Sequence, residues 1–169
     1  MGQNRLSEEE VHALYQCHAK ALVAYACSFG LDFSPAEDIV QQVFLKLLRG
    51  ETSVPEIPVG YLYRAVRNTC LNHRRDVARE LPLGQEGNWL EHRDGDRIAE
   101  IALQAALTNL PEEQREVVIM HIWGGLTLEE VAAASATSLS TAASRYRYAL
   151  DRLRKAFDVV KQAKEKGER

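Results

Sequence analysis

Residues 127–150 read TLEEVAAASATSLSTAASRYRYAL, a pattern that predicts two short helices separated by a turn. Thr127 and Glu130 have the spacing of a capping box, in which a hydroxyl and a carboxylate satisfy amide groups that a helix start leaves unpaired. Ser138 is placed to cap the second helix. Two such helices joined by about three residues are typical of a helix-turn-helix, which puts its second helix in the major groove of DNA. The spacing alone also fits an ordinary helical hairpin with a solvated basic face.

The predicted second helix carries hydroxyl and guanidinium groups on its outward side, and such groups suit base edges and phosphates. Ala136 stands in the turn before it, where a glycine is usual. Alanine is unfavourable in the left-handed conformation, although a slightly different turn avoids this cost. We predict DNA contacts from the following side chains: Ser138, Ser140, Thr141, Ser144, Arg145 and Arg147.

Helical periodicity, with apolar residues three and four positions apart, continues through most of the 169 residues. No stretch of any length alternates as a strand would. Capping signals, including a second capping box at Ser7 and Glu10, together with proline and glycine signals divide the chain into helices. The predicted apolar faces include Ile122 and Trp123 before Gly124, and Leu139 at the start of the last helix. The predicted helices cover about 8–29, 35–49, 59–79, 97–109, 111–123, 128–135 and 139–160. The fold class is therefore all-α, with two small helical domains, 1–79 and 97–169, joined by an acidic linker over 80–96.

The formal net charge is −3, from 21 Lys and Arg against 24 Asp and Glu. That total argues against a nucleic-acid binder, because most carry a basic excess. The distribution of charge reverses this view. Residues 60–79 hold five basic and one acidic group, residues 140–169 hold nine and four, and residues 76–110 hold three and seven. Two basic segments thus flank an acidic one.

The first basic segment mixes aromatic rings with cations and amides. Aromatic faces stack on unpaired bases and cations hold the backbone, so this composition suits strand-separated DNA. The alternative is that Tyr61 and Tyr63 are packing residues with solvated arginines around them. The predicted DNA-binding set here is Tyr61, Tyr63, Arg64, Arg67, Asn68, Asn72, Arg74 and Arg75.

Several other classes of protein are excluded or disfavoured. No apolar run approaches the roughly 20 residues of a membrane span, and the polar start MGQNRLSEEE is no signal peptide. The three cysteines are widely spaced, which favours buried thiols in a reducing cytosol over a disulfide framework or a metal site. No catalytic motif is present. We expect a cytoplasmic protein that is not an enzyme and uses no metal or cofactor.

Three blocks of the chain together resemble a known family. These blocks are AEDIVQQVFLKL at 36–47, GYLYRAVRN at 60–68 with Asn72 and Arg75 after it, and the stretch 110–154 with the helix-turn-helix. In this order and spacing they resemble a bacterial RNA polymerase sigma factor of the extracytoplasmic-function (ECF) type, which keeps only sigma domains two and four. The resemblance implies a factor that binds core RNA polymerase and directs promoter recognition, DNA melting and transcription initiation.

The resemblance also implies partners and contact residues. The helix at 36–47 would dock on the beta-prime clamp helices of core polymerase, through Asp38, Gln41, Gln42 and Lys46. The helix at 60–75 would melt promoter DNA and read the minus-ten element. The second domain would sit on the beta flap and read the minus-thirty-five element. An anti-sigma factor is a further candidate partner.

Two other interpretations stay open at this point. One is a stand-alone helix-turn-helix regulator, which would dimerise on a palindrome and ignore polymerase. The other is a degenerate relative that occupies an anti-sigma factor as a decoy, because the recognition helix is less cationic than is usual in the family. For a working sigma factor, that deficit predicts weaker or differently specific contacts to the minus-thirty-five element.

Overall fold

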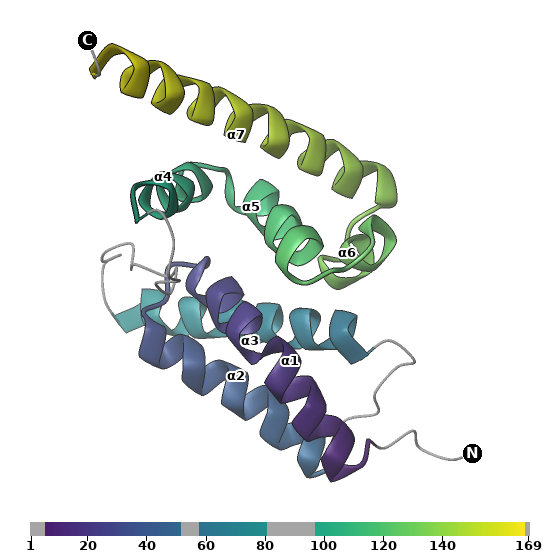
Figure 1. Cartoon of the computed structure of the whole chain (residues 1–169). Coiled ribbons are helices and arrows are strands. Elements are labelled where there is room, and N and C mark those ends of the chain that lie inside the picture. The colour runs from purple at the N-terminus through teal and green to yellow at the C-terminus, as the bar shows by residue number, and fades with distance from the viewer. Residues whose placement is uncertain (1–5, 52–57, 81–96, 168–169) are drawn as a thin grey trace.

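The computed structural model describes residues 6–51, 58–80 and 97–167, and within these ranges the chain contains helices and no strand. Figure 1 shows two layers, with α1, α2 and α3 beneath α4 to α7. None of the described helices is both long and apolar enough to cross a membrane. The elements are α1 (Glu8–Cys27), α2 (Phe33–Leu48), α3 (Pro58–Glu80), α4 (Arg97–Thr108), α5 (Glu112–Val118), a π-helical turn η1 (Ile119–Trp123), α6 (Leu128–Ala134) and α7 (Leu139–Gly167).

The first domain consists of α1, α2 and α3. Its start is the predicted capping box, in which the Glu10 amide donates to the Ser7 hydroxyl at 3.2 Å and the Ser7 amide donates to the Glu10 carboxylate at 2.7 Å. Gly30, with φ +83°, follows the end of α1 in a conformation that favours glycine. The apolar face of α2 forms the centre of this core, where Phe44 meets the edge of Tyr15 at a ring separation of 5.0 Å.

The start of α2 differs from the prediction by two residues. Asp32, not Ser34, precedes the helix, and its carbonyl accepts a hydrogen bond from the Ala36 amide at 3.1 Å. Pro35 therefore lies within the first turn instead of at the first position. This is tolerated because amide groups of a first helical turn have no partner inside the helix, so a missing amide there loses nothing.

The second domain consists of α4 to α7, with α7 lying along the others. Thr127 and Glu130 form the predicted capping box at the start of α6. Ser138 caps α7, since its hydroxyl accepts a hydrogen bond from the Thr141 amide at 3.1 Å. Between these caps Ala136 adopts φ +54°, so the turn does use the left-handed conformation. The last helix extends to Gly167, beyond the predicted end near residue 160.

Two predictions about the apolar faces of this domain are wrong. Ile122 and Trp123 were expected in an apolar stripe, but both side chains are exposed, because the chain widens into the π-helical turn before Gly124 and turns them outward. Leu139 was expected in the core and is 45% exposed. It is the first residue of α7, where the chain enters from an exposed turn.

The two domains pack directly against each other. Contacts join α3 to α6 and α1 to η1. Gly124 lies so close to Tyr63 that a Cβ added to the glycine would stand 2.8 Å from the tyrosine Cζ. The predicted architecture of two helical domains is confirmed. The predicted linker, 80–96, lies outside the described residues except for Glu80, which ends α3.

Candidate nucleic-acid interface

The predicted DNA-binding residues of the first domain all lie on α3, but they separate into two stripes. Residues three and four apart share one face of a helix, whereas a step of two turns the direction by about 200°. The exposed stripe contains Tyr61, Arg64, Asn68, Asn72 and Arg75. The covered stripe contains Tyr63, Arg67, Cys70 and Arg74, and it faces α1, α5 and the end of η1. Cover is incomplete at its end, where the Arg74 side chain is 42% exposed.

The exposed stripe presents chemistry that suits DNA. Arg64, Asn68, Asn72 and Arg75 are exposed, and Tyr61 is half-buried with part of its ring accessible. Arg75 donates a hydrogen bond to the Asn72 side-chain oxygen, one helical turn away. Two guanidinium groups can hold phosphates, two amides can reach base edges, and the ring can stack on a base.

Tyr63 does not belong to that surface, so its predicted DNA contact is wrong for this structure. Its side chain is 0% exposed, its ring lies 5.0 Å from the ring of Tyr25, and burial raises its pKa. The physical reason is the two-residue step from Tyr61, which turns Tyr63 to the opposite side of the helix. Tyr63 is therefore a packing residue, as the alternative interpretation had it, whereas part of the Tyr61 ring is accessible.

Arg67 and Arg74 are engaged by acids of the second domain. Arg67 Nε donates to the two carboxylate oxygens of Glu116 at 3.1 and 3.4 Å. Arg74 Nη1 donates to Glu112, and this hydrogen bond raises the pKa of the Arg74 guanidinium. Both acids belong to α5, 38 and 49 residues further along the chain. The sequence offered no local signal for these pairs, because Glu112 marks a helix start and Glu116 lies in an apolar stripe.

Glu116 is the central charged group of this contact. Its side chain is 2% exposed, and burial raises its pKa, while the charges of Arg67 and Arg145 act in the opposite direction. Arg145 comes from α7, the predicted recognition helix. One buried carboxylate is therefore close to a guanidinium from each of the two helices that are predicted to contact DNA.

The recognition helix begins with a cluster of hydroxyls. Ser138 Oγ lies 3.0 Å from Ser140 Oγ and 2.8 Å from Thr141 Oγ1. The Ser138 hydroxyl caps the helix, and because the residue is exposed, the hydroxyl can also reach a phosphate. Ser144 and Arg145, further along α7, are half-buried. Arg147 is exposed, with its guanidinium 5.1 Å from the centre of the Tyr148 ring. The predicted set thus lies on the first three turns of α7.

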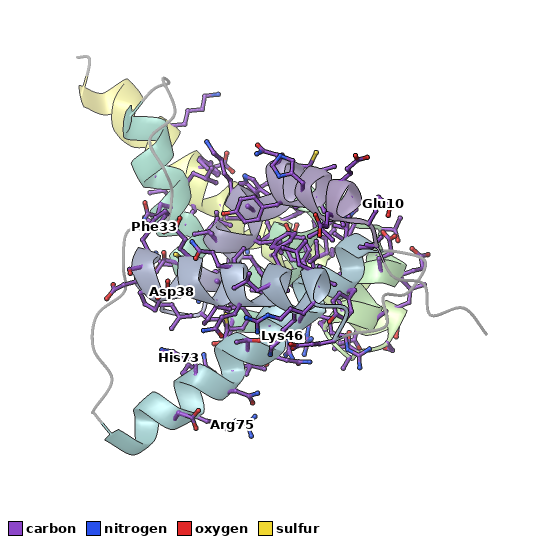
Figure 2. All side chains as sticks on the ribbon, turned by 90° about the horizontal axis from the view of Figure 1, so that it is seen from below. Glu10, Phe33, Asp38, Lys46, His73 and Arg75 are labelled. Atoms are coloured by element: carbon purple, nitrogen blue, oxygen red, sulfur yellow. The ribbon has the colours of Figure 1, made fainter. Side chains whose placement is uncertain are left out.

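The predicted polymerase contacts lie on the outer face of α2. Asp38, Gln41, Gln42 and Lys46 are all exposed. Figure 2 shows Asp38 and Lys46 along α2, with His73 and Arg75 on α3 below them in the view. A shallow groove of about 300 Å³ runs between the two helices. Its lining includes Asp38 and Gln42 from α2 and Asn72, His73 and Asp76 from α3, so the α2 face and the exposed stripe are continuous. Among the described side chains, no group of His, Cys, Asp and Glu could hold a metal ion.

Comparisons with known proteins agree with this architecture. The family Sigma-70 region 2 matches residues 14–80, and the family Sigma-70, region 4 matches residues 106–155. The ECF RNA polymerase sigma factor SigK of Mycobacterium bovis is 30% identical over 144 residues, which cover 76% of this chain and 75% of that protein. The chain belongs to the ECF RNA polymerase sigma factors. The ECF sigma factor SigL of Mycobacterium tuberculosis is 26% identical over 155 residues, covering 85% of this chain and 86% of SigL.

Two solved structures share the fold of this sigma factor. The sigma factor RpoE of Bartonella quintana, solved in complex with the anti-sigma factor NepR, matches with a TM-score of 0.76 at 23% identity. The match covers 90% of this chain and 99% of RpoE. CnrH, solved with the cytosolic domain of CnrY, matches with a TM-score of 0.63 at 24% identity and covers 90% of each chain. A sigma factor directs promoter recognition and transcription initiation, and the alternative of a stand-alone regulator is not favoured.

Proposed function

We propose that the exposed stripe of α3 contacts the minus-ten element and stabilises its melted strand. The observation that carries this proposal is the regular spacing of the stripe, which gathers one ring, two amides and two guanidinium groups on one accessible face. Such a face can stack an unpaired base and hold its phosphates at the same time. It needs no preformed cleft, since single-stranded DNA follows an open basic surface.

The other predicted surfaces complete this assignment. The outer face of α2 binds the clamp helices of core polymerase, and the first turns of α7 contact the minus-thirty-five element while the second domain rests on the beta flap. The functional domains extend over residues 1–79 and 97–169. The protein catalyses no reaction itself and acts in the cytoplasm, where core polymerase and the promoter are available to it. Because its basic excess is local, the polymerase must contribute part of the DNA affinity.

The proposal is tested by reconstitution with core RNA polymerase, followed by sequencing of the transcripts that start. Tyr61→Ala, Asn68→Ala and Arg145→Ala should each reduce run-off transcription, while circular dichroism shows an unchanged fold. Gln16→Ala, an exposed change on α1, serves as the control and should leave transcript yield unchanged. Full transcript yield from all three variants would exclude the assigned surfaces. Failure of the chain to capture core polymerase in a pull-down would exclude the polymerase-binding role.

A further inference from the structure

The two amide side chains of the exposed stripe are held differently. Asn68 and Asn72 stand about one turn apart on α3, and both are exposed. The side-chain oxygen of Asn72 accepts a hydrogen bond from Arg75 Nη2, from the next turn of the helix. Among the described residues, no group forms a hydrogen bond with the side chain of Asn68. Asn68 can therefore turn, whereas Asn72 is held in one orientation.

The chemistry of Arg75 decides which edge of the Asn72 amide is accessible. A guanidinium carries only N–H donors, whereas an amide carries an oxygen that accepts and a nitrogen that donates. The reverse amide orientation would place donors against donors, so the oxygen must face Arg75. In the planar amide the nitrogen then points away from Arg75. The edge of Asn72 that is turned away from Arg75 therefore presents donors only.

Arg75 adds further donors beside this edge. Within the part of the chain that the structure describes, no carboxylate forms an ion pair with its guanidinium. This distinguishes Arg75 from Arg67 and Arg74 on the covered stripe, both of which are paired with acids. One hydrogen bond to Asn72 leaves most of the N–H groups of Arg75 unused. Asn72 and Arg75 together form a donor pair, an exposed surface whose ideal ligand offers acceptors.

The bases differ in the acceptors that they offer to such a pair. On its major-groove edge guanine has two neighbouring acceptors, O6 and N7, whereas thymine offers O4 and adenine combines the N7 acceptor with an N6 donor. Cytosine presents its N4 donor there, which opposes the donor pair. This edge stays accessible when the strands separate, because it takes no part in base pairing. Guanine therefore satisfies the donor pair best and cytosine worst.

We propose that the donor pair selects guanine at one position of the minus-ten element. Asn72 donates to the base, and Arg75 is the positioning residue that keeps the amide oxygen away from it. Asn68, which nothing holds, accepts or donates and has no such restriction. The donor pair rests on the proposed function, because it assumes that the exposed stripe contacts the minus-ten element.

The experiment measures base preference, using the full chain reconstituted with core RNA polymerase. Start sites are first mapped by transcript sequencing, and one promoter is then randomised at each minus-ten position. Asn72→Asp keeps the shape of the side chain and its hydrogen bond from Arg75 but replaces the donor edge with an acceptor. Asn68→Asp is the matched control, because it makes the same change of charge and chemistry on the same stripe. Circular dichroism verifies the helical fold of each variant.

The wild type should use guanine over cytosine by roughly tenfold at one position, the size expected for a good pair of hydrogen bonds to a base edge. Asn72→Asp should abolish or reverse that preference, because an acceptor suits the N4 donor of cytosine. Asn68→Asp should leave it unchanged. If Asn72→Asp gives too few transcripts to count, the affinities of polymerase with this variant for labelled fork DNA carrying guanine or cytosine give the same ratio. An unchanged ratio in Asn72→Asp, or an equal loss in Asn68→Asp, would overturn the proposal.

The positioning role of Arg75 has its own outcome. Arg75→Ala releases the amide, which can then turn and pair with both N6 and N7 of adenine. Use of adenine should therefore rise relative to guanine at that position. A phosphate contact alone predicts a different result, since phosphates carry no sequence information. Equal losses of transcript from every promoter, with the base preference unchanged, would show that Arg75 holds only the backbone and would overturn its positioning role.

The same measurements separate the two proposals. A wild type that starts no transcripts, or whose transcription ignores the minus-ten sequence, contradicts the proposed function. A wild type that depends on the minus-ten sequence but has no position that prefers guanine contradicts the donor pair alone.

Discussion

The exposed and covered stripes of α3 have similar chemistry but different surroundings. Each contains a tyrosine and two arginines, spaced three and four residues apart. On the exposed stripe the arginines have solvent around them, whereas on the covered stripe they meet carboxylates of a distant helix and the tyrosine is fully buried. The comparison teaches that residue type alone does not decide which side of α3 is exposed. Position around the helix and the contacts of the second domain decided it.

The largest expected difference concerns the cysteines. Burial raises the pKa of Cys70, on the covered stripe, from 9.0 to about 12, and that of Cys27 to about 11, whereas Cys17 is exposed on α1. At pH 8 the raised pKa should lower the thiolate fraction of Cys70 roughly a thousandfold relative to an ordinary thiol. Cys70 should therefore react slowly, because the thiolate is the reactive form. Titration with a disulfide reagent should therefore show one fast thiol per chain, and mass spectrometry should place it at Cys17. Fast modification of Cys70 would mean that the covered stripe is open in solution.

The two tyrosines should differ next in their effect on stability. Tyr63→Ala removes a fully buried ring, so the free energy of unfolding should fall by about 3–5 kcal/mol. Tyr61→Ala removes a half-buried ring and should lower it by less than about 1.5 kcal/mol. Urea denaturation monitored by circular dichroism measures both values. Equal losses would contradict the assignment of the two residues to different stripes.

The arginines give a smaller contrast. Arg67→Ala leaves the carboxylate of Glu116 buried without its main partner, and the free energy of unfolding should fall by about 2 kcal/mol, below the range for a fully buried pair because the Arg67 side chain is itself 23% exposed. Arg64→Ala, on the exposed stripe, should change it by less than about 0.5 kcal/mol. A double-mutant cycle of Arg67 and Glu116 should show a clear coupling energy. Absence of coupling would show that the pair does not form in solution.

Local signals were sufficient for much of the fold. The capping boxes at Ser7 and Thr127 and the cap at Ser138 were predicted correctly, because each depends on side chains within three residues of the helix start. The start of α2 was predicted two residues late. A serine followed by a proline is a good start signal, but the backbone of Asp32 already accepts the first helical hydrogen bond.

The candidate site was predictable only in part. The burial of Tyr63 could have been inferred, since it lies three and seven residues before Val66 and Cys70, both of which are buried on the same helix. The pairing of Arg67 with Glu116 could not, because it joins residues 49 positions apart and depends on how the two domains meet. Helical periodicity identifies the face of a helix that is buried, but it does not identify the element that covers it.

The smallest expected effect comes from the helix-turn-helix, away from both stripes of α3. Ala136 is held at φ +54°, where alanine is less favourable than glycine by about 1–2 kcal/mol. Ala136→Gly should relieve that strain, while the greater freedom of glycine in the unfolded chain offsets part of the gain. The free energy of unfolding should therefore rise by about 0.5–1 kcal/mol, with the slow reaction of Cys70 unchanged.

The control for Ala136 is a nearby alanine with ordinary helical geometry. Ala133 is exposed within α6, so Ala133→Gly should lower the free energy of unfolding by about 0.5–1 kcal/mol. The two substitutions remove the same methyl group and are three residues apart, yet they should have opposite signs. A loss of stability in both would show that Ala136 is not held in the left-handed conformation. Opposite signs with an unchanged Cys70 reaction would show that strain in this turn is local and is not transmitted to the contact between α3 and α5.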